Sequence, residues 1–292
     1  MKQIFAYWTQ HPLASKSLLT VFMKFIWWQL ICRLKKTVVV SFATKSKLVV
    51  TKGMTGATGN IYCGLHEFED MGFVLHALRK SDHFLDIGAN IGSYSILAAS
   101  EIGATVDCFE PVPSTFRFLT QNIQINQLEA NCTAHNQGIG ASNATLRFTD
   151  DRDTVNHVIP DGSNRKGIDV PVQKLDDLQL PEKNIIAKID VEGFERYVIE
   201  GGINTLKKRN FSALIIELNG SGKRYGNDDL EIHEQLLQLG FLAHTYNPLR
   251  RQLIALNEPG PHNTIYVKEE SIPFIEERTK HANKISILGL SF

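Results

Sequence analysis

The sequence contains few cysteines, and none of the four lies in a C-x-x-C pair. Because Cys32, Cys63, Cys108 and Cys132 are widely spaced, they indicate neither a structural zinc site nor a disulfide framework. Cys108 and Cys132 fall inside expected strands, where a cysteine behaves as a small buried apolar residue. This use of cysteine suits a reducing compartment, and we expect a cytoplasmic protein.

The sequence also lacks an excess of either charge. Lysine and arginine number 31, and aspartate and glutamate number 31, so the formal net charge is zero. A nucleic-acid partner would favour a basic protein, so this balance argues against one. No internal repeat and no low-complexity tract is present, and 292 residues allow one large domain or two small ones.

A clean apolar run long enough to cross a bilayer is missing as well. The most apolar early stretch, residues 18–34, is interrupted by Lys24, Gln29 and Arg33, and the N-terminus lacks the pattern of a signal peptide. We expect residues 18–34 to form a helix whose apolar face packs on the domain. The alternative is peripheral contact with a membrane surface, since lysines at 16, 24, 35 and 36 accompany aromatic residues.

The most informative stretch that is present is Phe-Leu-Asp-Ile-Gly-Ala-Asn-Ile-Gly-Ser-Tyr, residues 84–94. An apolar strand reaches Asp86 and turns on Gly88, and Gly92 lies where a helix should begin. The free amides of a helix's first turn point at a bound ligand, and glycines let that ligand approach closely. The pattern predicts a binding site for an electron-rich ligand.

The residues after Gly88 decide which ligand fits. A dinucleotide fold requires G-x-G-x-x-G with its middle glycine against the pyrophosphate. Ala89 and Asn90 follow Gly88 instead, and Asp86 would repel a pyrophosphate. An acid before the turn suits a ligand with an ammonium group and no phosphate, such as S-adenosylmethionine (SAM).

A second acid supports this interpretation. The expected strand 105–109 ends at Glu110, which Pro111 follows. An acid at the end of the second strand can accept hydrogen bonds from both ribose hydroxyls. The alternative is that Glu110 only caps the next helix.

Strands and helices alternate along most of the chain. Repeated strand–helix units predict an α/β, Rossmann-like, doubly wound fold with a mostly parallel seven-stranded sheet and an antiparallel edge. The alternation is interrupted by a β insertion over residues 141–172. We expect an N-terminal extension over 1–80, with a hairpin at 37–51, a loop at 53–64 and a helix at 66–78. The main domain then spans 81–268, and a tail spans 269–292.

Ligands of such sheets bind beyond the carboxyl ends of the strands. The residues that this rule selects are Asp86, Gly88, Glu110, Asn136, Asp190 and Glu217.

The sequence resembles the FkbM-type methyltransferases of the class I SAM-dependent superfamily. The motifs that carry the resemblance are residues 85–94, Phe-Glu-Pro at 109–111, Leu-Asp-Asp at 175–177, Lys-Ile-Asp-Val-Glu-Gly-Phe-Glu at 188–195 and Glu-Leu-Asn at 217–219. It covers about residues 60–268. It implies methyl transfer from SAM, usually to a hydroxyl oxygen, on a sugar, a glycan or another small molecule such as a secondary metabolite.

The resemblance also implies site residues. Those expected to hold the amino-acid end of SAM are Asp86, Gly88, Ala89, Asn90 and Gly92. Glu110, with Pro111 beside it, would hold the ribose, while Asn136 and Gln137 would lie near the adenine.

A hydroxyl acceptor needs a general base to take its proton. Asp190 and Glu217 end neighbouring strands and are the first two candidates, and His157 in the insertion is the third. The alternatives are that Asp190 and Glu192 only fix their turn and that His157 is a solvated loop residue. Asp190, Glu192 and Glu217 could also hold a hard divalent ion; our expectation is a site without metal.

Two other functions stay open at this point: an NAD-dependent oxidoreductase, and a non-catalytic module that retains the nucleotide pocket. The insertion and the N-terminal segment are expected to shape the acceptor pocket, since loops carry specificity in this architecture. Asn219, Arg224 and Tyr225 follow the fifth strand and are candidate acceptor contacts. The sequence does not predict an oligomeric state.

Overall fold

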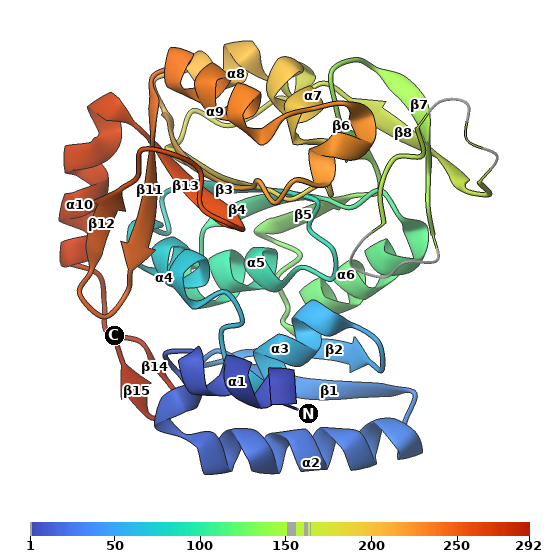
Figure 1. The fold of residues 1–292 in the computed structure, drawn as a ribbon, viewed down its shortest axis with the longest axis vertical. Coiled ribbons are helices and arrows are strands. Elements are labelled where there is room, and N and C mark those ends of the chain that lie inside the picture. Colours follow the sequence, from blue (N-terminus) through green and yellow to red (C-terminus); the bar gives the residue numbers. More distant parts are fainter. Residues whose placement is uncertain (1, 151–155, 161–162, 164) are drawn as a thin grey trace.

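A computed structural model describes residues 2–150, 156–160, 163 and 165–292. Its centre is an eight-stranded sheet with the strand order β12-β11-β13-β10-β9-β3-β4-β5 (Figure 1). Five strands pair in parallel: β10 (Phe211–Glu217), β9 (Ile185–Ile189), β3 (His83–Ile87), β4 (Thr105–Phe109) and β5 (Cys132–His135). The antiparallel edge consists of β13 (Asn263–Lys268), β11 (Phe241–Asn247) and β12 (Gln252–Ala255).

The predicted fold class is confirmed, and the sheet has one strand more than the sequence predicted. The extra strand, β12, forms a hairpin with β11 at the sheet's edge. It was missed because its four residues alternate only one buried side chain, Leu253, with exposed ones. The central strands β3 and β9 are buried along their whole length, as a strand covered on both faces should be.

Helices cover both faces of this sheet (Figure 1). One apolar cluster joins the sheet to α4 (Phe68–Ala77), α5 (Ser93–Ile96), the π-helical turn that continues it (Leu97–Ile102), α6 (Pro113–Ile125) and α10 (Ile272–Lys280). A second cluster joins the other face to α7 (Glu195–Glu200), α8 (Ile203–Lys207) and α9 (Asp229–Gln238). The two clusters make the sheet doubly wound.

The predicted β insertion forms a small separate sheet of β6 (Gly138–Ile139), β8 (Ile168–Gln173) and β7 (Ala144–Phe148). It follows β5 directly, so it stands beyond the carboxyl end of the parallel strands. Its strand β7 pairs with β8 in antiparallel register from Ala144 to Phe148.

The first 80 residues add α1 (Lys2–Gln10), α2 (Leu18–Leu34), the hairpin β1 (Thr37–Phe42) and β2 (Ser46–Thr51), and α3 (Thr55–Cys63). The hairpin is confirmed, and its β2 strand is tied to the core because Asn122 on α6 accepts the Val49 N–H at 2.6 Å. Buried side chains of α1, α2 and α3 belong to the same apolar cluster as α4 and α6.

The loop expected at 53–64 is wrong, because most of it is the helix α3. One of its glycines allows close packing: a Cβ on Gly59 would lie 2.4 Å from the His66 ring nitrogen Nδ1. The tail contains α10 and the short pair β14 (Ser286–Ile287) and β15 (Leu290–Ser291). Shorter 3-10 turns occur at Ala14–Lys16, Leu175–Asp177, Ser221–Tyr225 and Glu269–Ser271.

None of the helices in the described part of the chain has the length and apolarity that a bilayer crossing requires.

Candidate active site

A cavity of about 280 Å³ opens at the carboxyl ends of β3, β4, β9 and β10. The residues that line it come from the N-terminal segment, the turn after β3, the end of β4, the insertion and the ends of β9 and β10. Its polar and charged lining includes Asn60, His66, Glu67, Asp86, Asn90, Glu110, Asn156, Lys188, Asp190, Glu192 and Glu217. Of the six residues that the strand-end rule selected, five line this cavity and Asn136 does not.

The turn after β3 forms its floor. Gly88 has a φ of +83°, and a Cβ there would lie 1.8 Å from the Asp190 carbonyl oxygen. The Gly88 and Ala89 amides donate to the Phe109 carbonyl, and the Asp190 amide donates to the Ile87 carbonyl. Glycine is needed at 88 because the turn lies directly against the ends of two neighbouring strands.

Asp86 lies below this turn and is 1 % exposed. Its Oδ2 accepts the backbone N–H of Ser95 at 3.0 Å and the Ser95 hydroxyl at 2.5 Å. Burial raises the pKa of Asp86 to about 6, although both Ser95 hydrogen bonds oppose the rise. A cation that enters the cavity would stabilise the ionised form of Asp86 and lower its pKa.

Glu110 links two loops at the end of β4. Its Oε2 accepts the Asn90 N–H at 2.9 Å, and its Oε1 accepts the Val112 N–H, just before α6, also at 2.9 Å. The helix-start contact that the sequence offered as an alternative is therefore present, and Glu110 still lines the cavity. Burial raises the pKa of Glu110 to about 7.

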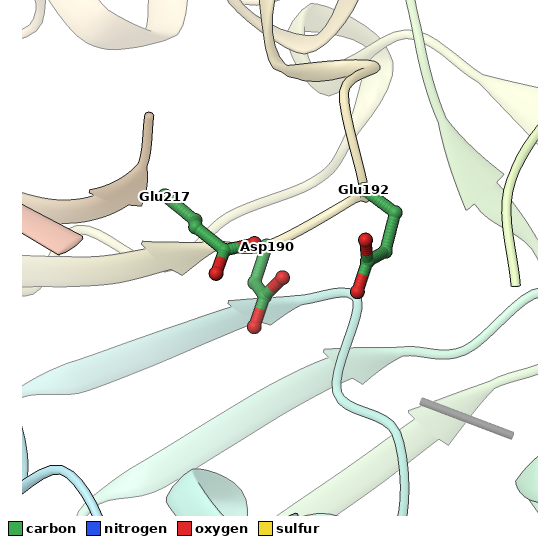
Figure 2. A group of neighbouring side chains, drawn as sticks. All are labelled: Asp190, Glu192 and Glu217. Carbon is green, nitrogen blue, oxygen red and sulfur yellow. The ribbon is translucent and has the colours of Figure 1, made fainter. Parts of the chain in front are cut away.

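Three further carboxylates gather where β9 and β10 end (Figure 2). Asp190 directly follows β9, Glu217 is the last residue of β10, and Glu192 lies in the loop after β9. One carboxylate oxygen from each of the three lies within 4.8 Å of the others. Burial and the nearby Asp190 carboxylate raise the pKa of Glu192 to about 7 and that of Glu217 to about 9. Glu217 therefore holds its proton at neutral pH, so it is a poor general base there.

Lys188 supplies a positive charge to this cluster. Its side chain is almost fully buried on β9, and its Nζ lies 2.5 Å from Asp190 Oδ2 and 4.9 Å from the centre of the Tyr94 ring. Burial alone would lower the pKa of Lys188, but the nearby carboxylates of Asp190, Glu67 and Asp86 together outweigh it, and the net shift is upward. Lys188 thus remains charged and fixes the Asp190 carboxylate at the cavity wall.

The N-terminal segment completes the wall. Tyr94 donates its hydroxyl to Glu67 Oε2 at 2.7 Å, and the Asn263 amide donates to Glu67 Oε1 at 3.0 Å. Residues of α3, among them Thr55, Ala57 and Asn60, line the cavity beside Glu67. The N-terminal segment therefore lines the cavity, and its expected part in shaping an acceptor pocket stays a prediction.

Four of the residues predicted for SAM binding or catalysis lie outside the cavity lining. Gly92 is the N-cap of α5 and faces Leu119, and Asn136 donates to the carbonyls of Glu110 and Pro111. Gln137 donates to the Gln173 side chain, while its neighbours Gly138 and Ile139 reach the cavity. His157 is buried with its backbone paired to Thr149, and it is the adjacent Asn156 that lines the cavity.

Sequence reasoning missed Lys188, Glu67 and the α3 residues. Lys188 carried a usable signal, because a lysine inside the otherwise apolar strand Ile-Ile-Ala-Lys-Ile must find a carboxylate partner. Glu67 and α3 carried none, since only the tertiary fold brings them to the strand ends.

The charge of the lining indicates what the cavity can hold. Within the described residues, six carboxylates (Glu67, Asp86, Glu110, Asp190, Glu192 and Glu217) face one lysine. Such a lining favours a ligand with positive charge and repels a phosphate-bearing one. The residues therefore fit a cofactor with an ammonium and a sulfonium group.

Comparisons with known proteins agree with this chemistry. The methyltransferase FkbM domain matches residues 86–243. The hexuronic acid methyltransferase AglP of Haloferax volcanii is 28 % identical over 149 residues, which are 50 % of this chain and 59 % of that protein. The chain thus matches less than two thirds of the length of this relative.

Solved structures with a similar arrangement share little sequence with the chain. A SAM-dependent O-methyltransferase from Thermotoga maritima aligns with a TM-score of 0.38 and 12 % identity over 68 % of this chain and 63 % of its own. TYW2 of M. jannaschii, in complex with AdoMet, aligns with a TM-score of 0.43 and 11 % identity over 80 % and 85 % of the two chains.

The FkbM match covers more than half of the chain and includes the β3 turn and the ends of β4, β9 and β10. The chain belongs to the FkbM methyltransferase family, and its cofactor is SAM.

Proposed function

We propose that the protein transfers a methyl group from SAM to a hydroxyl oxygen of a sugar or glycan. The observation that carries this proposal is the Asp190 carboxyl group, which Lys188 holds at the wall of an acid-lined cavity. The similarity to a hexuronic acid methyltransferase supports a saccharide as the acceptor class. Methyl transfer is the chemistry of the family, which argues against the oxidoreductase alternative.

SAM supplies an electrophilic methyl group on a positively charged sulfur. We assign its amino-acid end to the β3 turn, with Asp86, Gly88, Ala89, Asn90 and Gly92 as the residues that hold or shape it. Glu110 and Pro111 are assigned to the ribose. Asn136 and Gln137 are kept as positioning residues of the adenine side, because they brace the loop that presents Gly138 and Ile139 to the cavity.

Asp190 is the general base in this proposal. Lys188 holds its carboxyl group in place, so that it can accept the hydroxyl proton while the acceptor oxygen is held behind the methyl group. Glu217 carries a proton at neutral pH and serves as the neighbour that holds Asp190 in place. Because His157 lies outside the cavity lining, we give it no proton-transfer role.

No divalent ion is part of this proposal, although Asp190, Glu192 and Glu217 lie close enough to share one. The Lys188 ammonium already occupies one oxygen of Asp190. It supplies the positive charge that a metal would otherwise bring to this group of acids.

A second groove is the place that we assign to the rest of the acceptor. It shares Phe194 with the cavity and is lined by Arg147, Tyr197, Arg224 and Tyr225. Phe194 and Tyr197 stack with ring centres 4.3 Å apart, which presents an aromatic wall. Arginines next to aromatic rings suit a saccharide that carries a carboxylate, since a guanidinium pairs with a carboxylate through two parallel hydrogen bonds.

We also propose that residues 81–268 are the catalytic domain, that 1–80 are an extension packed on it, and that 269–292 are a tail. A cytoplasmic location remains part of this proposal.

The test is methyl transfer from isotopically labelled SAM to a panel of neutral sugars and hexuronates, with the product identified by mass spectrometry. We expect O-methylated saccharide from the wild type. Asp190→Asn should lower turnover by about 10²–10⁴-fold, the usual contribution of a general base, and SAM should still bind. Turnover near the wild-type value in Asp190→Asn would remove Asp190 from the base role, and label only on nitrogen or carbon would refute O-methylation.

A further inference from the structure

The first 66 residues contain no aspartate and no glutamate, but they contain eight lysines and one arginine. All 31 acidic residues of this formally neutral chain follow residue 66. Residues 1–66 are therefore basic, and the rest of the chain has a net negative charge. No part of the proposed methyl-transfer site requires this separation of charge.

The helix α2 is apolar around most of its circumference, which is typical of a helix that is covered on all sides. One of its faces is covered: Val21 and Trp28 are buried, and Phe25 lies edge-on against Trp8 and Tyr62. This face attaches α2 to the domain, as the sequence predicted.

The other face of α2 is exposed. Leu19 is 76 % exposed, Met23 61 % and Leu30 57 %, and the stripe is completed by Phe22, Ile26, Trp27 and Leu34. These residues recur at helical spacing, so they lie along one side of α2. Figure 1 shows α2 along one outer edge of the molecule, on the far side of α1 and α3 from the central sheet.

This exposed apolar surface is concentrated in one place. Of the 17 large apolar side chains that are exposed in the described residues, ten lie within the first 34 residues. An exposed apolar patch of this kind marks an interaction site. Exposed basic residues bracket it, with Lys16 before α2 and Arg33, Lys35 and Lys36 at its end.

From this combination we propose that the exposed face of α2 docks on the surface of a bilayer that contains anionic lipids. The apolar stripe enters the boundary between head groups and acyl chains, and the bracketing lysines and Arg33 contact the anionic head groups. The helix lies in the plane of the surface, because its 17 residues do not suffice for a crossing. The proposal is independent of the proposed acceptor.

A second copy of the chain is a poorer occupant of this face. A two-fold interface would bring the same surface of both copies together, so two basic segments without a single acid would meet. Their like charges would repel at close range, whereas an anionic bilayer attracts them.

Tryptophan fluorescence provides a direct assay on the full-length chain. Trp8 and Trp28 are buried, and Trp27 is 44 % exposed, so a shift on adding vesicles reports mainly on Trp27. We expect a blue shift with vesicles of phosphatidylcholine and phosphatidylserine, and much weaker binding to phosphatidylcholine alone or at high salt. Trp27→Phe should remove the shift while vesicle co-sedimentation persists.

Two pairs of variants separate the contributions. Lys35→Gln with Lys36→Gln should weaken binding to anionic vesicles roughly thirtyfold, and Ile26→Ser with Leu30→Ser should weaken it at least tenfold. The matched controls are Lys207→Gln with Lys208→Gln, and Leu230→Ser with Leu237→Ser, which change equally exposed residues elsewhere. The controls should bind vesicles as the wild type does, and all variants should bind SAM normally, which shows that they fold.

Absence of binding to anionic vesicles, or equal losses in the control pairs, would overturn the proposal. So would self-association in sedimentation experiments that Ile26→Ser with Leu30→Ser abolishes while vesicles have no effect, because the face would then be an interface between copies.

Discussion

Replacing Gly88 by alanine tests the geometry on which the SAM site depends. With a φ of +83°, Gly88 is in the left-handed region, where a Cβ costs about 1–2 kcal/mol. The added Cβ would also lie 1.8 Å from the Asp190 carbonyl oxygen, which is backbone and is held by the hydrogen bond between the Asp190 amide and Ile87. Relieving this overlap should add about 1–3 kcal/mol, as overpacking in a core does.

Gly240→Ala is the matched control, because Gly240 has a φ of +85° and nothing lies within 4 Å of its would-be Cβ. Urea unfolding should therefore show Gly88→Ala to be less stable than Gly240→Ala by about 1–3 kcal/mol. Moving the turn away from β9 should also weaken SAM at least tenfold in calorimetry, whereas Gly240→Ala should bind SAM normally. Equal stability losses in the two variants, with SAM affinity unchanged in both, would refute the close approach of the turn and β9.

Two other predictions concern the acids at the ends of β9 and β10. The folded-state pKa of Glu217, about 9, lies above its ordinary value of 4.5, so the folded protein loses stability as pH rises from 4.5 to 9. Glu217→Gln should thus raise the melting temperature by an amount that grows from pH 5 to pH 9. The control, Glu258→Gln, changes an exposed residue and should have no such effect. A gain in melting temperature that is independent of pH would contradict the raised pKa of Glu217. Because the Lys188 ammonium already occupies one oxygen of Asp190, a chelator should leave turnover unchanged, and loss of turnover that Mg²⁺ restores would show a metal site at Asp190, Glu192 and Glu217.

The sequence predicted residues of the cavity lining where a short local pattern indicates a position in the whole fold. An apolar strand that ends in an acid indicates a sheet edge, and Asp86, Glu110, Asp190 and Glu217 line the cavity for that reason. Short apolar runs likewise predicted the hairpin at 37–51 and the antiparallel strands that close the sheet.

The structural features that the sequence did not predict depend on contacts between residues far apart in the chain. Glycines at 56 and 59 suggested a loop, but tertiary packing makes that segment α3 and brings it to the cavity. Two short helices, α7 and α8, follow β9, and Gly201 between them lies so close to the insertion that a Cβ there would be 2.0 Å from the Gly140 carbonyl oxygen. No pattern near Lys188 states which carboxylates surround it.

The acid-lined cavity is the basis of the proposed function, and it predicts how the affinity for SAM depends on pH. Burial raises the pKa of Asp86 to about 6 and those of Glu110 and Glu192 to about 7. A cation favours the ionised carboxylates, so SAM must displace any protons that they hold, and its affinity should rise as pH increases from 6 to 8. S-adenosylhomocysteine lacks the charged sulfur and should respond less.

The most direct measurement is therefore the affinity of the wild-type protein for SAM and for S-adenosylhomocysteine, determined by calorimetry from pH 6 to pH 8 in buffers of different ionisation enthalpy. We predict that SAM binding strengthens with pH and releases protons, and that S-adenosylhomocysteine shows a shallower dependence. Identical pH dependence for the two ligands, or SAM affinity that falls as pH rises, would contradict a carboxylate-lined site for the sulfonium cofactor.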